Sequence, residues 1–238
     1  MSYTPDKSLY FNPDIEYLFN AEIIEYDLQS AGLSLIREYR LLPPEKITSL
    51  EKLDKQERNI VIGKLQRDQA GFSRTLLDKF TLARQTFLTE NSIADDRIIS
   101  VRKDAIFTVG RCDRTVFGEL HFTERNEYSS YVRFSRNGNL EAYYSDSGVD
   151  IKGIGEMGLS KHRLYLLIFL RKVIGMIEGK NQTLKRYLRT FVDDYKSGKL
   201  DDGYYLEFNH VSQVLNQLFN YQRLIVPLVQ IAVEELES

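Results

Sequence analysis

The spacing of apolar positions along the chain changes twice, at about residues 97 and 157. In residues 1–96 most apolar positions recur three or four residues apart, which is typical of amphipathic helices. The exception is Glu22–Asp27, where β-branched and aromatic residues indicate a strand. We therefore expect a helical N-terminal part with one strand, and its helices lie at Ser30–Leu41, from Pro44 onward, at Asp54–Gln66 and at Asp68–Glu90.

Residues 97–153 have the alternating pattern of strands. The runs IISV and AIFTVG flank a polar turn at 102–104, and three further runs follow. Asn137-Gly138 stands between the last two runs and is a strong hairpin signal. This zone predicts an antiparallel meander of about five strands.

Residues 157–238 return to the helical spacing, and the expected helices are Ser160–Glu178, Gln182–Ser197 and His210–Glu237. The order of helices, then hairpins, then helices favours an α+β fold over a parallel βαβ sheet. We predict an α+β domain over residues 1–156 and a helical region packed on it over residues 157–238.

Composition narrows the class of protein. Apolar residues make up 42% and charged residues 28%, so a folded globular chain is expected. The formal net charge of -2 excludes a strongly basic nucleic-acid binder, and any such contact needs a local basic stripe. Cys112 is the single cysteine, and no segment resembles a signal peptide or a bilayer-spanning helix. The expected location is the cytoplasm, with no membrane partner.

One segment combines a strand, an aspartate and a helix start. Residues 23–35 read IIEYDLQSAGLSL, so an apolar strand delivers Asp27 shortly before a helix begins. The pattern D-x-x-S-x-x-x-S-[IL] resembles motif A of family B nucleic-acid polymerases. In that family the aspartate binds magnesium, which implies that Asp27 is a metal ligand and that Leu28 supplies a backbone carbonyl.

A second segment has two apolar strands around a tight turn. Residues 98–109 read IISVRKDAIFTV, with Asp104 at the exit of the turn. This segment resembles motif C of family A and family B polymerases, the hairpin that places a second carboxylate beside the first. The resemblance implies a palm domain in which Asp27 and Asp104 are catalytic and bind Mg²⁺. Phosphoryl transfer uses two such ions about 4 Å apart to stabilise the attacking and leaving oxygens.

The interval between the two motifs carries the cations that a triphosphate requires. A basic helix surface suits a polyphosphate, and we expect nucleoside triphosphate to be bound by Arg58, Lys64 and Arg67. For a nucleic-acid substrate the candidate contacts are Arg74, Lys103, Arg125 and Arg133.

The sequence also departs from the polymerase pattern. Arg102 stands where family B has an earlier aspartate, and Ala105 where family A has a glutamate. The resemblance covers residues 22–110, which implies a minimal or degenerate palm encoded by a phage, or one piece of a complex with other polymerase or phage subunits.

The sequence therefore agrees with two functions. The first is a palm-type nucleotidyltransferase, and the second is a non-catalytic phage protein that binds nucleic acid or protein on a degenerate palm. Each site residue also has a structural alternative. Asp27 suits a helix N-cap, Asp104 suits a turn, and the cations between them suit a solvated helix face.

Overall fold

The computed structural model divides the chain into two compact units, and it describes residues 3–4, 8–134, 140–153, 163–201, 204, 207–208, 211–212, 228 and 230–231. The first unit comprises Met1–Ile15 and Glu22–Glu127. The second comprises Glu16–Ala21 and Tyr128–Ser238. The chain therefore passes between the units three times. The predicted domains, 1–156 and 157–238, have a different boundary, and that division stays a prediction.

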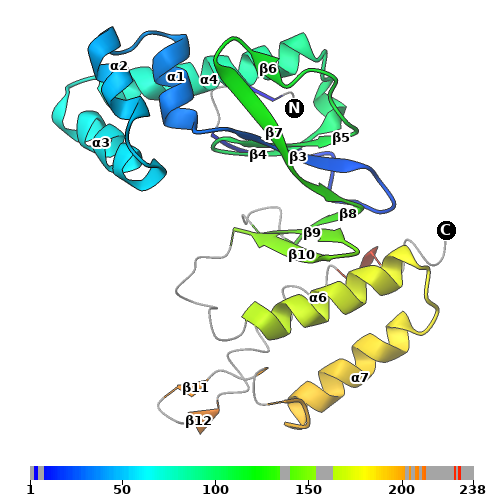
Figure 1. Ribbon diagram of the computed structural model, residues 1–238. Helices are drawn as coiled ribbons and strands as arrows, with labels where there is room; N and C mark the ends of the chain where they lie inside the picture. Colours follow the sequence, from blue (N-terminus) through cyan, green and yellow to red (C-terminus); the bar gives the residue numbers. More distant parts are fainter. Residues whose placement is uncertain are drawn as a thin grey trace. The chain divides into compact units, whose positions relative to one another are not determined.

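The first unit contains a six-stranded antiparallel sheet and four α-helices (Figure 1). In spatial order its strands are β1 (Leu9–Phe11), β4 (Ile98–Arg102), β5 (Ala105–Val109), β3 (Ile23–Leu28), β7 (Leu120–Tyr128) and β6 (Val116–Phe117). Between β3 and β4 the chain forms α1 (Ala31–Glu38), α2 (Pro44–Glu51), α3 (Lys55–Asp68), α4 (Phe72–Glu90) and the 3₁₀ helix η1 (Asp95–Arg97).

The helices of this unit pack on one face of β3. Side chains alternate between the faces of a strand, and Tyr26 and Leu28 lie in the hydrophobic core that α1 and α4 share. The ring centres of Tyr26 and Phe87 of α4 are 5.0 Å apart. Asp27, between these two core residues, therefore points to the opposite face of the sheet.

The second unit has its own sheet and core. In spatial order its strands are β10 (Gly148–Lys152), β9 (Glu141–Ser145), β8 (Ser130–Arg133) and β2 (Tyr17–Leu18). Helix α6 (Arg163–Glu178) packs on β9 and β10, and α7 (Leu184–Lys196) packs on α6, where the rings of Phe169 and Phe191 are 4.4 Å apart (Figure 1). A short pair of strands is formed by β11 (Glu207–Phe208) and β12 (Val211–Ser212).

The α+β class is confirmed, whereas two finer predictions are wrong. The N-terminal part contains three strands, because the aromatic segment 9–18 forms β1 and β2. The strands of residues 97–153 form no single meander, since β4 to β7 join the first sheet and β8 to β10 the second. Alternation marks each strand but does not specify a partner that is distant in sequence.

The predicted helix His210–Glu237 is wrong at its start, where Val211–Ser212 form β12. Within it, Leu228, Gln230 and Ile231 are helical, and its other residues lie outside those described. The predicted Asn137-Gly138 turn lies outside them too, although the flanking strands β8 and β9 pair antiparallel. No helix in the described ranges has both the length and the apolar character to cross a bilayer.

Candidate functional site: two aspartates at adjoining strand ends

Strand β3 carries Asp27 in the middle of the first sheet, between β5 and β7. Asp27 is opposite Ala105 in the antiparallel register of β3 and β5. Its carboxylate is partly accessible, with 28% of the side chain exposed. The N-cap of α1 is Ser30, which has a left-handed φ of 46° and no side-chain capping bond. The alternative interpretation of Asp27 as a helix cap is therefore wrong.

The tight turn between β4 and β5 carries Asp104. Arg102 pairs with Ala105, so Lys103 and Asp104 are the two residues of the turn. Lys103 adopts a positive φ of 56°, and its backbone N–H donates to the carbonyl of Ser8 at 2.7 Å. A hairpin turn of two residues requires such a φ, because only a mirror-image turn follows the twist of the flanking strands.

The structure brings the two predicted catalytic aspartates together. The backbone N–H of Leu28, the residue after Asp27, donates to the carbonyl of Asp104 at 3.3 Å. Burial raises the pKa of Asp27, and the negative charge of Asp104 raises that pKa further. A carboxyl group whose ionisation is disfavoured by a neighbouring negative charge forms a site that a cation would stabilise.

One cation already lies at this pair. The guanidinium Nη1 of Arg125, on β7, is 3.5 Å from Oδ2 of Asp27 and lowers the pKa of that carboxyl. Burial and Asp104 outweigh this effect, because 60% of the Arg125 side chain is exposed and water screens the pair. The Thr123 hydroxyl also donates to the backbone carbonyl of Asp27 at 3.2 Å, which fixes β7 beside the site.

A second cation acts on Asp27 from α3. Asp54 caps this helix by accepting bonds from the backbone N–H groups of Gln56 and Glu57, and Glu57 completes a capping box. Lys55, the first helical residue, also lowers the pKa of Asp27 through its positive charge. The sequence analysis missed Lys55, although the pattern Asp54…Glu57 marks a helix start at this position.

The predicted triphosphate ligands of α3 have no bond to the aspartates in the part of the chain that is described. Arg58 is half-buried and donates to the carbonyl of Leu53 at 3.3 Å, whereas Lys64 is exposed. Arg67 pairs with its neighbour Asp68 at 3.2 Å. None of the three forms a hydrogen bond or ion pair with Asp27 or Asp104.

The remaining predicted residues are spread over both units. Arg74 is exposed on α4, and Lys103 is exposed in the turn next to Asp104. Arg133 lies in β8 of the second unit, where its backbone N–H donates to Glu16. Leu28 is only 3% exposed. Of the predicted nucleic-acid ligands, Arg125 and Lys103 are thus the two beside the aspartates.

A buried arginine holds the turn of Asp104 in place, and it was not predicted. Arg84 of α4 is 2% exposed, and it donates to the carbonyl of Lys103 at 3.0 Å and to the Tyr3 hydroxyl at 3.1 Å. Buried arginines are rare unless they are hydrogen-bonded. The signal in the sequence is that Arg84 is three residues before Phe87, within the apolar stripe of α4.

The donor set at this site fits magnesium. Mg²⁺ in proteins is bound by one or two carboxylates together with water and substrate phosphates, and Asp27 and Asp104 supply such carboxylates with partial access to solvent. No group of three or more histidine, cysteine or acidic residues with metal-binding geometry is found among the described residues. The candidate carboxylates are those of Asp27 and Asp104, and the negative charge of Glu25 also raises the pKa of Asp27.

The sequence was compared with models of known protein families, and one family matches. The model of the family described as Bacteriophage PBS1 gene 130 protein matches residues 2–231. The chain belongs to this phage family. No curated protein matches the chain. The expected phage origin agrees with the PBS1 gene 130 family, and the family description states no activity.

Proposed function

We propose that this member of the PBS1 gene 130 family is a palm-type nucleotidyltransferase that acts on nucleic acid with divalent metal. The observation that carries the proposal is the register of β3 and β5, in which Asp27 is opposite Ala105 and next to Asp104. Two acidic residues that are distant in sequence thereby lie at the same end of two adjacent strands.

The order of elements supports the same function. The strand of Asp27 is followed by α1 to α4 and then by the β4–β5 hairpin, which is the order of motif A, helical stretch and motif C. The hairpin also joins the sheet through β5, so the turn with Asp104 reaches the end of β3.

Each residue has a proposed role in this reaction. Asp27 and Asp104 hold the divalent cation, which when bound stabilises the attacking and leaving oxygens of phosphoryl transfer. Arg125 neutralises Asp27 in the metal-free protein and binds a phosphate of the substrate in the loaded state. Lys55 binds the triphosphate, together with the cations Arg58, Lys64 and Arg67 of the same helix.

The test is incorporation of labelled nucleotides into primed and unprimed DNA and RNA, with millimolar Mg²⁺ or Mn²⁺. Asp27→Asn and Asp104→Asn are each expected to lower the rate by about 100-fold or more, because each removes a metal-binding oxygen. Asp78→Asn is the matched control, since Asp78 is exposed on α4 and lies outside the site. Wild type that incorporates nothing on any substrate, or aspartate variants as active as wild type, would contradict the proposal.

The second candidate function is a non-catalytic protein that binds nucleic acid or another protein. The ion pair between Arg125 and Asp27 favours it, because a resident cation competes with metal. Arg102 and Ala105, which replace acidic residues of the polymerase motifs, favour it as well. A melting temperature that is unchanged by millimolar metal plus nucleotide would support this function, since any ligand of the folded state raises it.

A further inference from the structure

Basic residues are concentrated in the segment from the middle of α6 to the middle of α7 in the second unit. Residues 171–189 contain six cations and one acidic residue, Glu178, whereas the whole chain has a formal net charge of -2. All six cations are exposed, and they are Arg171, Lys172, Lys180, Lys185, Arg186 and Arg189. We call this set the basic α6–α7 segment. It is the local basic stripe that the overall charge does not reveal.

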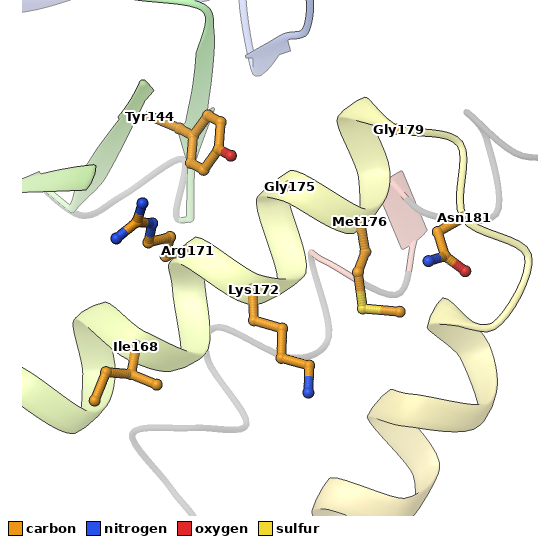
Figure 2. A pocket seen from close by; sticks show the side chains of 8 residues that line it. All are labelled: Tyr144, Ile168, Arg171, Lys172, Gly175, Met176, Gly179 and Asn181. Atoms are coloured by element: carbon orange, nitrogen blue, oxygen red, sulfur yellow. The ribbon is translucent and has the colours of Figure 1, made fainter. Parts of the chain in front are cut away.

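A hollow of about 540 Å³ lies along α6. Its lining includes Arg171, Lys172, Met176, Asn181 and, from β9, Tyr144 (Figure 2). Figure 2 shows Tyr144 and Arg171 on one side of the helix, with Lys172 and Met176 pointing to the side on which α7 lies. The hollow is large enough for a nucleotide and is open to solvent.

The two cations of the hollow contact a carbonyl group and an aromatic ring. Nη2 of Arg171 donates to the backbone carbonyl of Asp146 at 2.7 Å, and Nζ of Lys172 is 4.4 Å from the ring centre of Tyr187. Neither contact is with a carboxylate, and in the described ranges neither side chain forms an ion pair. Glu178 instead accepts a hydrogen bond from the Ser130 hydroxyl at 2.6 Å.

Glycine shapes the wall of the hollow. A Cβ atom at Gly175 would lie 3.0 Å from the Tyr144 hydroxyl, so a larger residue would displace the tyrosine. The absence of a side chain lets Tyr144 lie against α6 beside Arg171. The result is a partly exposed aromatic ring next to the guanidinium of Arg171, a combination that suits a base and its phosphate.

We propose that the basic α6–α7 segment and its hollow bind a single strand of nucleic acid. Arg171 binds a phosphate beside Tyr144, which contacts a base or sugar. Lys172 binds a further phosphate on the side of α6 that faces α7, and the cations of α7 extend the path. Charge favours this partner, because nucleic-acid affinity comes largely from phosphate neutralisation. A lipid surface fits less well, since α6 and α7 expose only one large apolar side chain among those described, Ile168 at 47%.

This inference goes beyond the proposed catalysis, and it can fail separately from it. The binding residues lie in the second unit, and Asp27 and Asp104 lie in the first. Asp27→Asn is therefore expected to bind nucleic acid as wild type does. Loss of catalysis in that variant with retained binding would separate the two proposals experimentally.

The experiment is fluorescence anisotropy of the full chain with labelled single-stranded DNA and RNA of mixed sequence at several salt concentrations. The test variant is Arg171→Gln/Lys172→Gln. We expect its affinity to fall about tenfold, and the slope of log affinity against log salt to shrink by about 1.4, as for two lost phosphate contacts on a single strand.

The matched control is Lys196→Gln/Lys199→Gln. It removes the same charge from exposed positions at the opposite end of α7 and just after it. We expect less than a twofold change in affinity for this control. Circular dichroism of both variants checks that α6 and α7 remain folded.

Three outcomes would overturn the proposal. The first is wild type that binds neither DNA nor RNA at low salt. The second is an equal loss in the test and control variants, which would reduce the effect to net charge. The third is tighter binding to phosphatidylserine vesicles or to polyglutamate than to either oligonucleotide, which would assign the surface to a membrane or to an acidic protein.

Discussion

At the scale of single residues, Asp27 is in an environment that favours metal binding but lowers the stability of the folded chain. It lies in a central strand, is partly buried, faces the negative charge of Asp104 and has Arg125 as its exposed counterion. Functional sites often keep such unfavourable groups because the activity depends on them. Replacing them stabilises the fold but removes the activity.

This environment predicts how the stability of the fold depends on pH. Because the pKa of Asp27 is raised in the folded chain, its ionisation favours the unfolded state. The cost is absent below the ordinary aspartate pKa of about 3.9, where both states hold the proton, and it is complete above the raised pKa. We expect Asp27→Asn to melt ~1–2 °C above wild type at neutral pH. At strongly acid pH the variant and wild type should melt at the same temperature.

Thermal melting across this pH range measures the effect, with Asp78→Asn as the control that should follow wild type. Millimolar Mg²⁺ should raise the melting temperature of wild type and leave that of Asp27→Asn unchanged. A variant that is less stable than wild type at neutral pH would show that the pairing with Arg125 outweighs burial.

At the scale of elements, α4 and the β4–β5 hairpin are joined by one buried side chain. Arg84 donates to the carbonyl of Lys103 and to the Tyr3 hydroxyl, so it links the helix to the turn that carries Asp104. The positive φ of Lys103 makes this turn sensitive to the loss of its hydrogen bonds.

Arg84→Met is therefore expected to lower the free energy of unfolding by about 2–3 kcal/mol, because buried hydrogen-bond partners of a charged group lose their donor. Urea denaturation measures this change. Arg74→Met is the control, since Arg74 is exposed on the same helix, and its effect should stay within about 0.5 kcal/mol. Equal stability of the two variants would mean that the linkage contributes nothing.

The elements were also what the sequence predicted best. The strand with Asp27, the hairpin with Asp104 and the helix beginning at Pro44 follow from local patterns, and the structure contains all three. Strand partners were not predictable, because the pairing of β2 with β8 depends on contacts between distant segments. For the same reason Arg84 and Lys55 were missed, since each acts on a group that is distant in sequence.

At the scale of the whole molecule, each of the two units is built from two segments of the chain, and the segments of the two units alternate along the sequence. Glu16–Ala21 belongs to the second unit although residues on both sides of it belong to the first. In this segment β2 forms the edge of the second sheet, with Tyr17 opposite Val132 and Leu18 opposite Tyr131.

A fragment of residues 128–238 is therefore expected to be poorly soluble, because β8 would present an unpaired edge. A fragment in which residues 16–21 are joined to 128–238 through a flexible linker should remain monomeric. Size-exclusion chromatography distinguishes the two results. A monomeric, folded 128–238 fragment would show that β2 is dispensable for the second unit.

The interleaving has a consequence during protein synthesis. Residues 17–18 leave the ribosome early, but their partner strand, Ser130–Arg133, is made only after the whole first unit. The second sheet therefore cannot be completed while translation of the first unit is in progress, and β2 must stay unpaired during that interval. A bound chaperone would protect this exposed segment until its partner is available.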